Sequence, residues 1–387
     1  MGDGALTGFF EEYLYKDSLF CERGTLQSGY IPEKIGHREK EINQIAQILA
    51  PSIRSERPSN LFIYGKTGTG KTLAIKHVTS QLQEVATQKG VPIHSVYINC
   101  KLKRAADTEY RLIAQLIRSF GGSVAATGLP TDEVYRAFFE VVDSEKRTVV
   151  IVLDEIDELV RRAGDEALYS LLRINEDLKN SQISIVGISN DLIFIDTIDP
   201  RVKSSLSEEE LIFPPYNALQ LQDILRSRSE MAFSSGRLAA GVIEKCAAYA
   251  AREHGDARRA LELLRVAGEL AERENHSEVG VGHIDGAEEK IERDRVIDIV
   301  GSQPKQSQAA VVALLALNEK NKESISTGEV YSTYKPISTK AGLRPLTQRR
   351  IADILAELDM LGIINTRVVS KGRYGRTREV SLLIPSL

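Results

Sequence analysis

The sequence has few cysteines and no long hydrophobic run. Its three cysteines, Cys21, Cys100 and Cys246, are far apart and form neither a zinc-site spacing nor a disulfide framework. Cys100 ends an apolar, strand-like run, and we interpret it as a small core residue rather than a nucleophile. No stretch of 18 apolar residues could span a membrane, and residues 1–4 lack the character of a signal peptide. We therefore expect a cytoplasmic protein with no membrane partner.

Internal repeats and low-complexity tracts are also missing. A chain of 387 residues is too long for one core and favours roughly two or three domains. The net charge of −4 is unevenly distributed. Residues 300–387 carry 13 Lys or Arg against 7 Asp or Glu, whereas the preceding 299 residues carry 37 against 47. The C-terminal region therefore has the positive charge that a nucleic-acid-binding module uses.

The order of apolar segments predicts three domains. Residues 60–213 alternate short strands with helical stretches, a pattern typical of a parallel α/β sheet. The clearest expected strands are Leu61–Tyr64, Ile93–Asn99, Thr148–Leu153 and Ile183–Ser189. From Pro214 to about Val300 every segment has a helical pattern, and Gly301–Pro304 is a candidate linker. We predict domains over 1–213, 214–300 and 301–387, and the aromatics of the first 19 residues suggest that this segment docks on the first domain.

A glycine-rich segment follows the first expected strand and opens a helical stretch. It matches G-x-x-x-x-G-K-[ST] through Gly65, Lys66, Thr67, Gly68, Thr69, Gly70, Lys71 and Thr72, and Leu73 continues the helix. Backbone N–H groups of such a loop enclose phosphates, and the positive end of the helix faces the anion. The alternative is a glycine-rich turn that matches by chance. With a strand before it and a helix after it, the loop predicts binding of ATP or ADP.

Two carboxylates end the strand-like run Val149–Leu153. Beside a phosphate loop, Asp154 and the Thr72 hydroxyl can hold Mg²⁺, and Glu155 can orient or deprotonate the attacking water. Taken alone, an acidic pair after a hydrophobic strand is often a solvated turn. In this order we interpret the pair as catalytic.

Three further polar residues occur at intervals after the acidic pair. Asn190 ends the strand-like run 183–189, Arg201 lies in Asp-Pro-Arg-Val, and Arg258 begins a helix after Gly-Asp-Ala. In isolation, Asn190 could be ordinary turn chemistry and both arginines ordinary surface residues. Next to a phosphate loop, the amide could bind the terminal phosphate, and a guanidinium could spread its donors over transferring phosphoryl oxygens.

Residues 306–387 have the pattern of a winged helix. We expect helices over Ser307–Asn318, Thr327–Tyr334 and Leu346–Leu361, followed by strands over Ile363–Val369 and Glu379–Ile384. The first turn of the third helix and the basic hairpin between the strands are the candidate DNA contacts. They comprise Thr347, Gln348, Arg349, Arg350, Lys371, Arg373, Tyr374, Arg376 and Arg378. The alternatives are a basic turn that only aids solubility and a winged helix that binds protein.

The ordered set of motifs resembles the AAA+ ATPases and, along nearly the whole chain, the archaeal replication initiators of the origin-recognition-complex and Cdc6 family. The residues that carry this resemblance are Tyr30-Ile31-Pro32, Gly65–Thr72, Asp154-Glu155-Ile156-Asp157, Asp199-Pro200-Arg201-Val202, Gly255–Arg259 and the winged helix. The resemblance implies that Asn190 is the first sensor, Arg258 the second sensor and Arg201 an arginine finger offered to a neighbouring subunit.

The same resemblance implies an adenine pocket and a second DNA contact. Tyr30, Ile31 and Pro32 would form part of the adenine pocket, although their composition alone fits an ordinary proline turn with a hydrophobic anchor equally well. Tyr216 could line the pocket or merely pack the hinge between domains. An inserted motif that touches DNA would fall within Phe120–Asp132 and include Thr127, Gly128 and Leu129.

What the resemblance implies is a nucleoid-associated initiator that binds double-stranded origin DNA and helps recruit the replicative helicase, with other initiator subunits or paralogues as partners. ATP hydrolysis would act as a slow switch. A winged-helix signal-transduction ATPase that regulates transcription is the first alternative. A clamp-loader-like factor that meets DNA only through a protein partner is the second.

Overall fold

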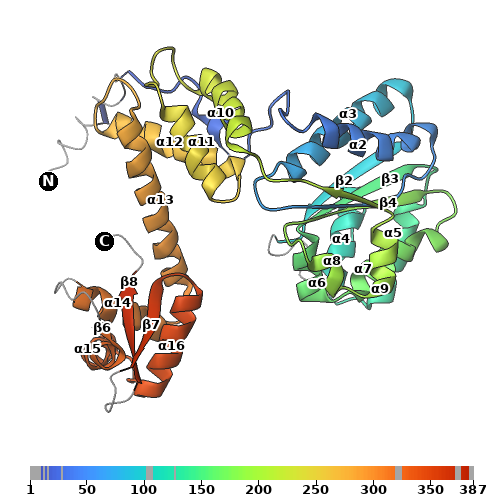
Figure 1. The fold of residues 1–387 in the computed structure, drawn as a ribbon. Coiled ribbons are helices and arrows are strands. Elements are labelled where there is room, and N and C mark those ends of the chain that lie inside the picture. The colour runs from blue at the N-terminus through green and yellow to red at the C-terminus, as the bar shows by residue number, and fades with distance from the viewer. Residues whose placement is uncertain are drawn as a thin grey trace. The chain divides into compact units, whose positions relative to one another are not determined.

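The computed structural model describes most of the chain as two compact units, Met1–Val281 and Gly282–Leu387 (Figure 1). We describe each unit by itself. The described residues are 10–11, 14, 17–27, 29–101, 108–125, 128–318, 325–370 and 376–382.

A parallel five-stranded sheet, with helices packed around it, forms the part of the first unit that contains the phosphate loop (Figure 1). Its order is β2-β3-β4-β1-β5, with β1 Leu61–Tyr64, β2 Ile93–Asn99, β3 Thr148–Asp154, β4 Gln182–Ser189 and β5 Glu209–Ile212. The four expected strands are confirmed to within one residue. The edge strand β5 was not expected, because its two glutamates are exposed and hide the apolar alternation.

Helices cover both faces of this sheet. Side chains that alternate along β3 explain why: Val150 and Val152 pack with α2 and α3, whereas Val149 and Ile151 pack on the opposite face. The first face is covered by α2 Glu39–Leu49 and α3 Lys71–Lys89. The second is covered by α4 Glu109–Ser119, α5 Thr131–Val142, α6 Ile156–Ala163, α7 Glu166–Arg173, α8 Phe194–Thr197 and α9 Pro200–Leu206. Because all strands are parallel, the loops after β1, β3 and β4 emerge at the same edge.

Three lid helices follow the sheet in the same unit: α10 Ala218–Ala232, α11 Val242–Arg252 and α12 Ala257–Arg273. The N-terminal segment packs on this lid. Glu272 of α12 accepts hydrogen bonds from Ser18 Oγ and Leu19 N, and the rings of Phe20 and Phe233 lie 4.6 Å apart. The expectation that the first 19 residues dock on the ATPase domain is therefore wrong for the residues described there. Gly268 of α12 leaves the space that the Phe20 ring fills.

The second unit is a winged helix. It contains α14 Lys305–Asn318, β6 Ile325–Ser326, α15 Thr327–Lys340, α16 Gln348–Met360, β7 Ile364–Ser370 and β8 Arg376–Leu382, with sheet order β6-β8-β7. Its core joins Ile351, Ile354, Leu355 and Leu358 of α16 to residues of the other elements. The helical pattern over 346–361 predicts these four residues and Leu361 as a buried stripe. The four are confirmed, whereas Leu361, just beyond the end of α16, is 42% exposed.

Three details of this region differ from expectation. Helix α13, Val281–Ser302, continues through Gly301, so only Gln303 and Pro304 separate it from α14. Helix α15 continues past Pro336, because Ile337 and Ser338 beyond it contribute to the core. Strand β8 begins at Arg376 rather than Glu379, since antiparallel pairing of Ser370 with Arg376 extends the ladder toward the hairpin tip.

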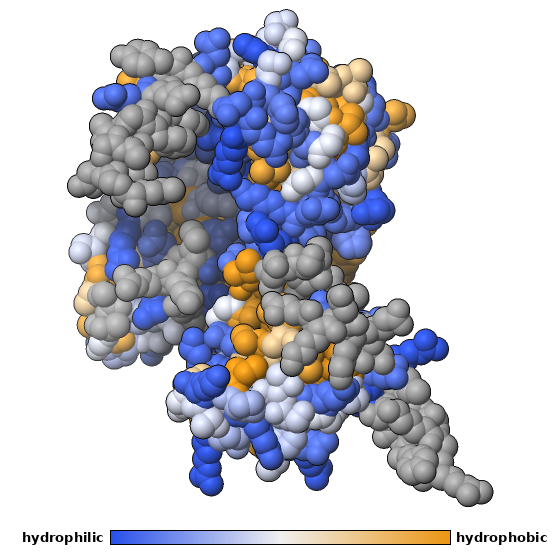
Figure 2. Space-filling model, turned by 90° about the vertical axis from the view of Figure 1, so that its left-hand side faces the viewer, coloured by the Kyte–Doolittle hydropathy of each residue, from blue (hydrophilic) through white to orange (hydrophobic). Residues whose placement is uncertain are grey.

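Surface polarity agrees with the composition. Figure 2 shows one face on which hydrophilic side chains predominate among the described residues, with smaller hydrophobic groups between them. Within the described ranges, no helix combines the length and apolar character that a membrane crossing needs.

Asn60 joins the start of β1 to its neighbour β4. Its side chain is 1% exposed, accepts a hydrogen bond from Ile185 N at 2.8 Å and donates to Ser205 O at 2.8 Å. We expect Asn60→Ala to lower the free energy of unfolding by about 1–3 kcal/mol, because it leaves buried backbone groups unpaired. Urea unfolding of the full chain would measure this. Gln88→Ala, an exposed change on α3, is the control and should cost about 0.5 kcal/mol or less; an equal effect of both changes would contradict the prediction.

Candidate nucleotide site and DNA-contacting surfaces

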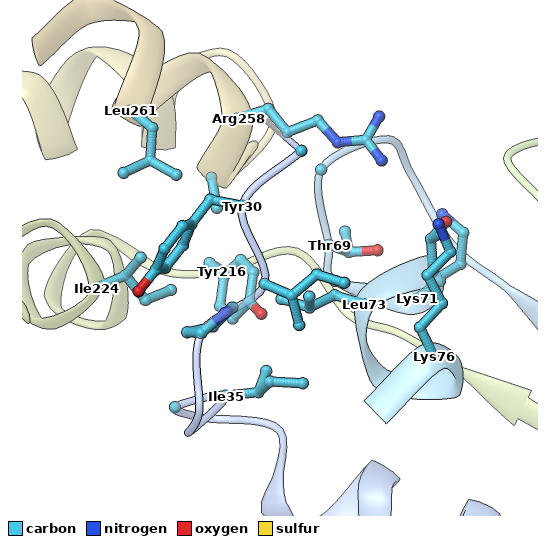
Figure 3. A pocket seen from close by; sticks show the side chains of 18 of the residues that line it. Tyr30, Ile35, Thr69, Lys71, Leu73, Lys76, Tyr216, Ile224, Arg258 and Leu261 are labelled. Carbon is cyan, nitrogen blue, oxygen red and sulfur yellow. The ribbon is translucent and has the colours of Figure 1, made fainter. Parts of the chain in front are cut away.

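A cleft of about 530 Å³ lies in the first unit, at the carboxyl edge of the sheet. It is bounded by the phosphate loop, the ends of β3 and β4, the segment before α2, and the lid helices α10 and α12 (Figure 3). The structure brings together these predicted site residues as its lining: Tyr30, Ile31, Pro32, Gly68, Thr69, Gly70, Lys71, Thr72, Leu73, Asp154, Glu155, Asn190, Tyr216 and Arg258. Gly65, Lys66, Thr67 and Arg201 are not part of that lining.

Two glycines allow the loop its shape. Gly68 has φ 67°, and a Cβ there would overlap the Asp256 carboxylate at 1.6 Å from Oδ1. Gly70 has φ 93° and precedes α3, and a Cβ there would lie 2.8 Å from the Tyr216 hydroxyl oxygen. Both backbone conformations are left-handed, and residues other than glycine rarely adopt them.

Lys71 begins α3 and is 4% exposed. Its ammonium group donates to Gly65 O and Lys66 O, each at 2.7 Å. Burial and, to a smaller extent, the positive charge of Arg258 lower the pKa of Lys71 to about 8, although the negative charge of Asp154 opposes this shift. The residue therefore gains much from any anion that enters the cleft.

Asp154 is held by three donors. Its Oδ2 accepts from Thr72 Oγ1 at 2.8 Å and from Tyr97 OH at 2.6 Å, and its Oδ1 accepts from Glu155 N at 3.0 Å. Burial, followed by the hydrogen bond to Asp154, raises the pKa of Tyr97. Tyr97 could not be predicted as a site residue. A tyrosine on an apolar strand can be a core residue or can face a carboxylate, and its sequence context is the same in both cases.

Glu155 occupies a strained position. Its φ of 55° is left-handed, which turns the chain sharply between β3 and α6. Burial raises the pKa of Glu155, and Lys101, whose Nζ lies 3.8 Å from Oε2, lowers it. Oε2 has no hydrogen-bond partner in the described part of the chain. A buried carboxylate oxygen without a donor at the mouth of the cleft suits a group that receives a proton or a hydrogen bond.

The lid touches the phosphate loop through the start of α12. Ala257 N donates to Gly68 O at 3.2 Å, and Asp256 caps the helix by accepting from Arg258 N at 2.7 Å. On its outer side, Lys66 Nζ lies 3.4 Å from Nδ1 of His254. Arg258 thus begins a helix whose N-terminus rests on the loop, while Asn190 approaches the cleft from the end of β4.

Arg38 is a second residue that sequence reasoning missed. It is 2% exposed, its Nε donates to Thr69 O at 2.9 Å, and one terminal nitrogen donates to Pro214 O. Its guanidinium lies 4.0 Å from the centroid of the Tyr216 ring. Tyr216 therefore lines the cleft and packs beside the hinge. That it contacts adenine stays a prediction. An arginine at a helix start carries no signal that it is buried.

Arg201 lies apart from this cleft. It is paired with its neighbour Asp199 at 2.9 Å, is 70% exposed and lines a separate open cavity of about 590 Å³. Hydrogen bonds from Arg201 lower the pKa of Asp199 to about 2. Arg201 therefore does not reach the phosphate site of its own subunit. This is consistent with the expected role of Arg201 as an arginine finger for a neighbouring subunit, and that role stays a prediction.

At the start of α16, Thr347 caps the helix by accepting from Arg350 N at 3.4 Å. Gln348, Arg349 and Arg350 are exposed beside it. Arg350 lies 3.7 Å from both Asp353 Oδ2 and Glu357 Oε1, whereas Arg349 makes no ion pair with any described residue.

The other candidate DNA contacts are only partly described. Lys371, Arg373 and Tyr374 lie outside the described residues, as does Thr127. Arg376 and Arg378, predicted in a hairpin turn, belong to strand β8. Gly128, with φ 103°, and Leu129, 38% exposed, lie in the loop between α4 and α5.

The donors and acceptors of the cleft fit a magnesium nucleotide. Lys71 and the loop N–H groups supply positive potential at one end, and Thr72 and Asp154 offer the hard oxygen ligands that Mg²⁺ prefers. Apolar side chains gather at the other end, around Tyr30, Ile224 and Leu261 (Figure 3).

This fold and cleft define the class as an AAA+ protein with a helical lid and a C-terminal winged helix. Models of three domain families match the chain: an AAA domain over residues 54–192, the Cdc6 AAA+ ATPase-type lid domain over 222–289, and the CDC6 C-terminal winged helix domain over 298–387. An ORC1-type DNA replication protein of Thermococcus onnurineus is 50% identical over 99% of this chain and 92% of its own. One from Archaeoglobus fulgidus is 51% identical over 96% and 90%. The chain belongs to the family of archaeal ORC1-type DNA replication proteins.

Solved structures agree with this assignment. The Aeropyrum pernix ORC1 protein in complex with DNA has 45% identity and a TM-score of 0.80, covering 96% of this chain and 95% of that one. Drosophila ORC bound to DNA, at 22% identity and a TM-score of 0.60, shares the fold. The comparisons do not favour the transcription-regulator alternative.

Proposed function

We propose that this protein is an ATP-dependent initiator of DNA replication that binds duplex origin DNA and helps recruit the replicative helicase. The observation that carries the proposal is the single cleft in which the phosphate loop, Asp154, Glu155 and Arg258 of the lid meet. The relation to an ORC1 protein in complex with DNA supports the DNA-binding part.

Each cleft residue has a role in this proposal. Lys71 and the loop N–H groups bind the phosphates of ATP, and Thr72 and Asp154 hold Mg²⁺, which supplies positive charge to those phosphates. Glu155 orients the attacking water, and Asn190 donates to the terminal phosphate. Tyr30, Ile31 and Pro32 enclose the base together with Tyr216.

Hydrolysis works as a switch because the start of the lid helix α12 is bound to the phosphate loop. The hydrogen bond from Ala257 N to Gly68 O brings Arg258 to the phosphate end of the cleft. Arg258 interacts with ATP more strongly than with ADP, since the terminal phosphate adds negative charge within its reach. Arg201, on a separate surface, is offered to the nucleotide of another initiator subunit or paralogue.

Footprinting on genomic fragments tests the proposal as a whole. Full-length protein with ATP should protect a few replication start regions, and ADP should alter the extent of protection. Protection at many promoters instead would support the transcription-regulator alternative. Failure of the purified chain to bind duplex DNA at moderate salt would support the clamp-loader-like alternative.

Glu155→Gln tests the hydrolysis step. The substitution keeps the shape of the side chain and removes its charge, so ATP should still bind while turnover stops. Nucleotide binding by calorimetry and phosphate release measure the two parts. Lys71→Ala is the matched comparison and should abolish binding itself. Equal turnover by wild type and Glu155→Gln would remove Glu155 from the mechanism.

Lys71 predicts a pH dependence of ATP affinity. Its pKa of about 8 in the free protein means that the amine is charged below pH 8 and increasingly neutral above it. Because bound phosphates favour the charged form, binding above pH 8 must take up a proton, and affinity should fall by up to about tenfold per pH unit. Titrations from pH 7 to 9.5 measure this. Lys71→Arg stays charged and should flatten the profile, so equal profiles would contradict the prediction.

Arg349 tests base recognition by the winged helix. Arg349 is exposed and forms no ion pair with a described residue, so its side chain is available to a base. Arg349→Ala should therefore weaken binding to origin DNA by about 1–3 kcal/mol and leave binding to random duplex nearly unchanged. Lys89→Ala, which removes an exposed basic side chain at the end of α3 in the first unit, is the control. Fluorescence anisotropy with both duplexes measures the difference, and a parallel loss on both by Arg349→Ala would exclude base reading.

A further inference from the structure

Arg228 of the lid helix α10 is a buried cation to which no described residue supplies a counter-ion. It is 7% exposed and lines the nucleotide cleft. Its Nη1 is buried and has no hydrogen-bond partner within the part of the chain that the structure describes. Burial lowers the pKa of its guanidinium.

A buried guanidinium without a hydrogen-bond acceptor or counter-ion destabilises the folded protein unless a ligand supplies one. A buried donor without a partner loses its hydration and receives nothing in return. Other buried cations in or near the cleft are satisfied: Lys71 donates to two loop carbonyls, and Arg38, behind the loop, donates to Thr69 O and contacts Glu41. Arg228 is the exception among these three, and its missing partner therefore points to a ligand.

The stacking partner of Arg228 shows which part of the side chain is left for that ligand. Its guanidinium carbon lies 4.4 Å from the centroid of the Tyr30 ring. The ring covers one flat face of the guanidinium. The N–H groups lie in the guanidinium plane, so they remain able to donate from its edge.

The neighbours of Tyr30 show which part of a nucleotide would meet that edge. In Figure 3, Tyr30 lies beside Ile224 and Leu261, on the opposite side of the view from Lys71 and Lys76. The phosphate-binding groups are therefore at the other end of the cleft. Apolar and aromatic walls with one directed donor suit a purine ring, which stacks through its faces and accepts through its ring nitrogens.

We propose that Arg228 donates a hydrogen bond from its guanidinium edge to an acceptor nitrogen of the adenine ring and so acts as a specificity-determining residue for the base. This inference rests on the proposed binding of ATP in the cleft. Arginine has no acceptor, so the exocyclic amino group of adenine cannot be its partner. Tyr30 holds the guanidinium in the plane that the base edge meets.

The first experiment compares Arg228→Met with wild type in the full chain. Methionine keeps an unbranched stem against Tyr30 and removes both the charge and the donors, so the fold should tolerate it. We expect the Kd for ATP and for ADP, measured by calorimetry, to rise by about tenfold to hundredfold. Arg226→Ala, two residues away, exposed and outside the cleft lining, is the control and should change either Kd by less than about twofold.

The second experiment replaces the acceptor nitrogens of the base one at a time. ATP, 1-deaza-ATP, 3-deaza-ATP and 7-deaza-ATP are titrated into wild type and Arg228→Met. One analogue should bind wild type about tenfold to hundredfold more weakly than ATP, and Arg228→Met should weaken that analogue no further. The effects of the variant and of the missing nitrogen are then not additive, as a direct contact requires.

Other outcomes would overturn the inference. Equal weakening of ATP and all three analogues by Arg228→Met would make Arg228 a structural residue only. Wild type that binds all three analogues as tightly as ATP would refute the contact without any use of the variant. Wild type that binds no ATP would refute the proposed function itself, whereas tight ATP binding by both proteins would refute only the role of Arg228.

Discussion

The cleft depends on the contact between the phosphate loop and the N-terminus of α12. Ala257 N donates to Gly68 O, and the Asp256 carboxylate occupies the space that a side chain at Gly68 would need. The loop can therefore meet the lid so closely only because it has no Cβ there. This contact joins the parallel sheet and the helical lid, which are separate in the sequence, into one site.

Buried charge gives the cleft its chemistry. Lys71, Arg38 and Arg228 are each less than a tenth exposed, and only Lys71 could be expected from a sequence motif. The guanidinium of Arg38 donates hydrogen bonds to backbone carbonyls of the loop and of the hinge, so it links these two segments. Desolvated groups of this kind interact strongly with an incoming anion or dipole, because little water screens them. The cleft is thus already charged and shaped to receive a nucleotide.

Much of this arrangement could be predicted because it follows local rules. Four strands were expected to within one residue, since a parallel sheet buried on both faces needs continuous apolar runs. The phosphate loop and the acidic pair at Asp154 have fixed spacing, and parallel strands bring their ends to one edge. Strand β5 and Tyr97 could not be predicted, because exposed glutamates hide the first and an apolar strand hides the second.

The sequence by itself determined the class of the protein: a P-loop domain, an all-helical lid and a basic winged helix, each written in short-range patterns of apolar, glycine and charged residues. Only the tertiary structure decided which charges are buried and which partners they have. In the structure, the segment around Phe20 packs on the lid, and Arg38 is buried at the hinge. Arg228 is buried as well and forms no ion pair with a described residue. Burial and pairing depend on contacts between residues that are far apart in the sequence. Short-range sequence patterns do not indicate which of these residues will come into contact.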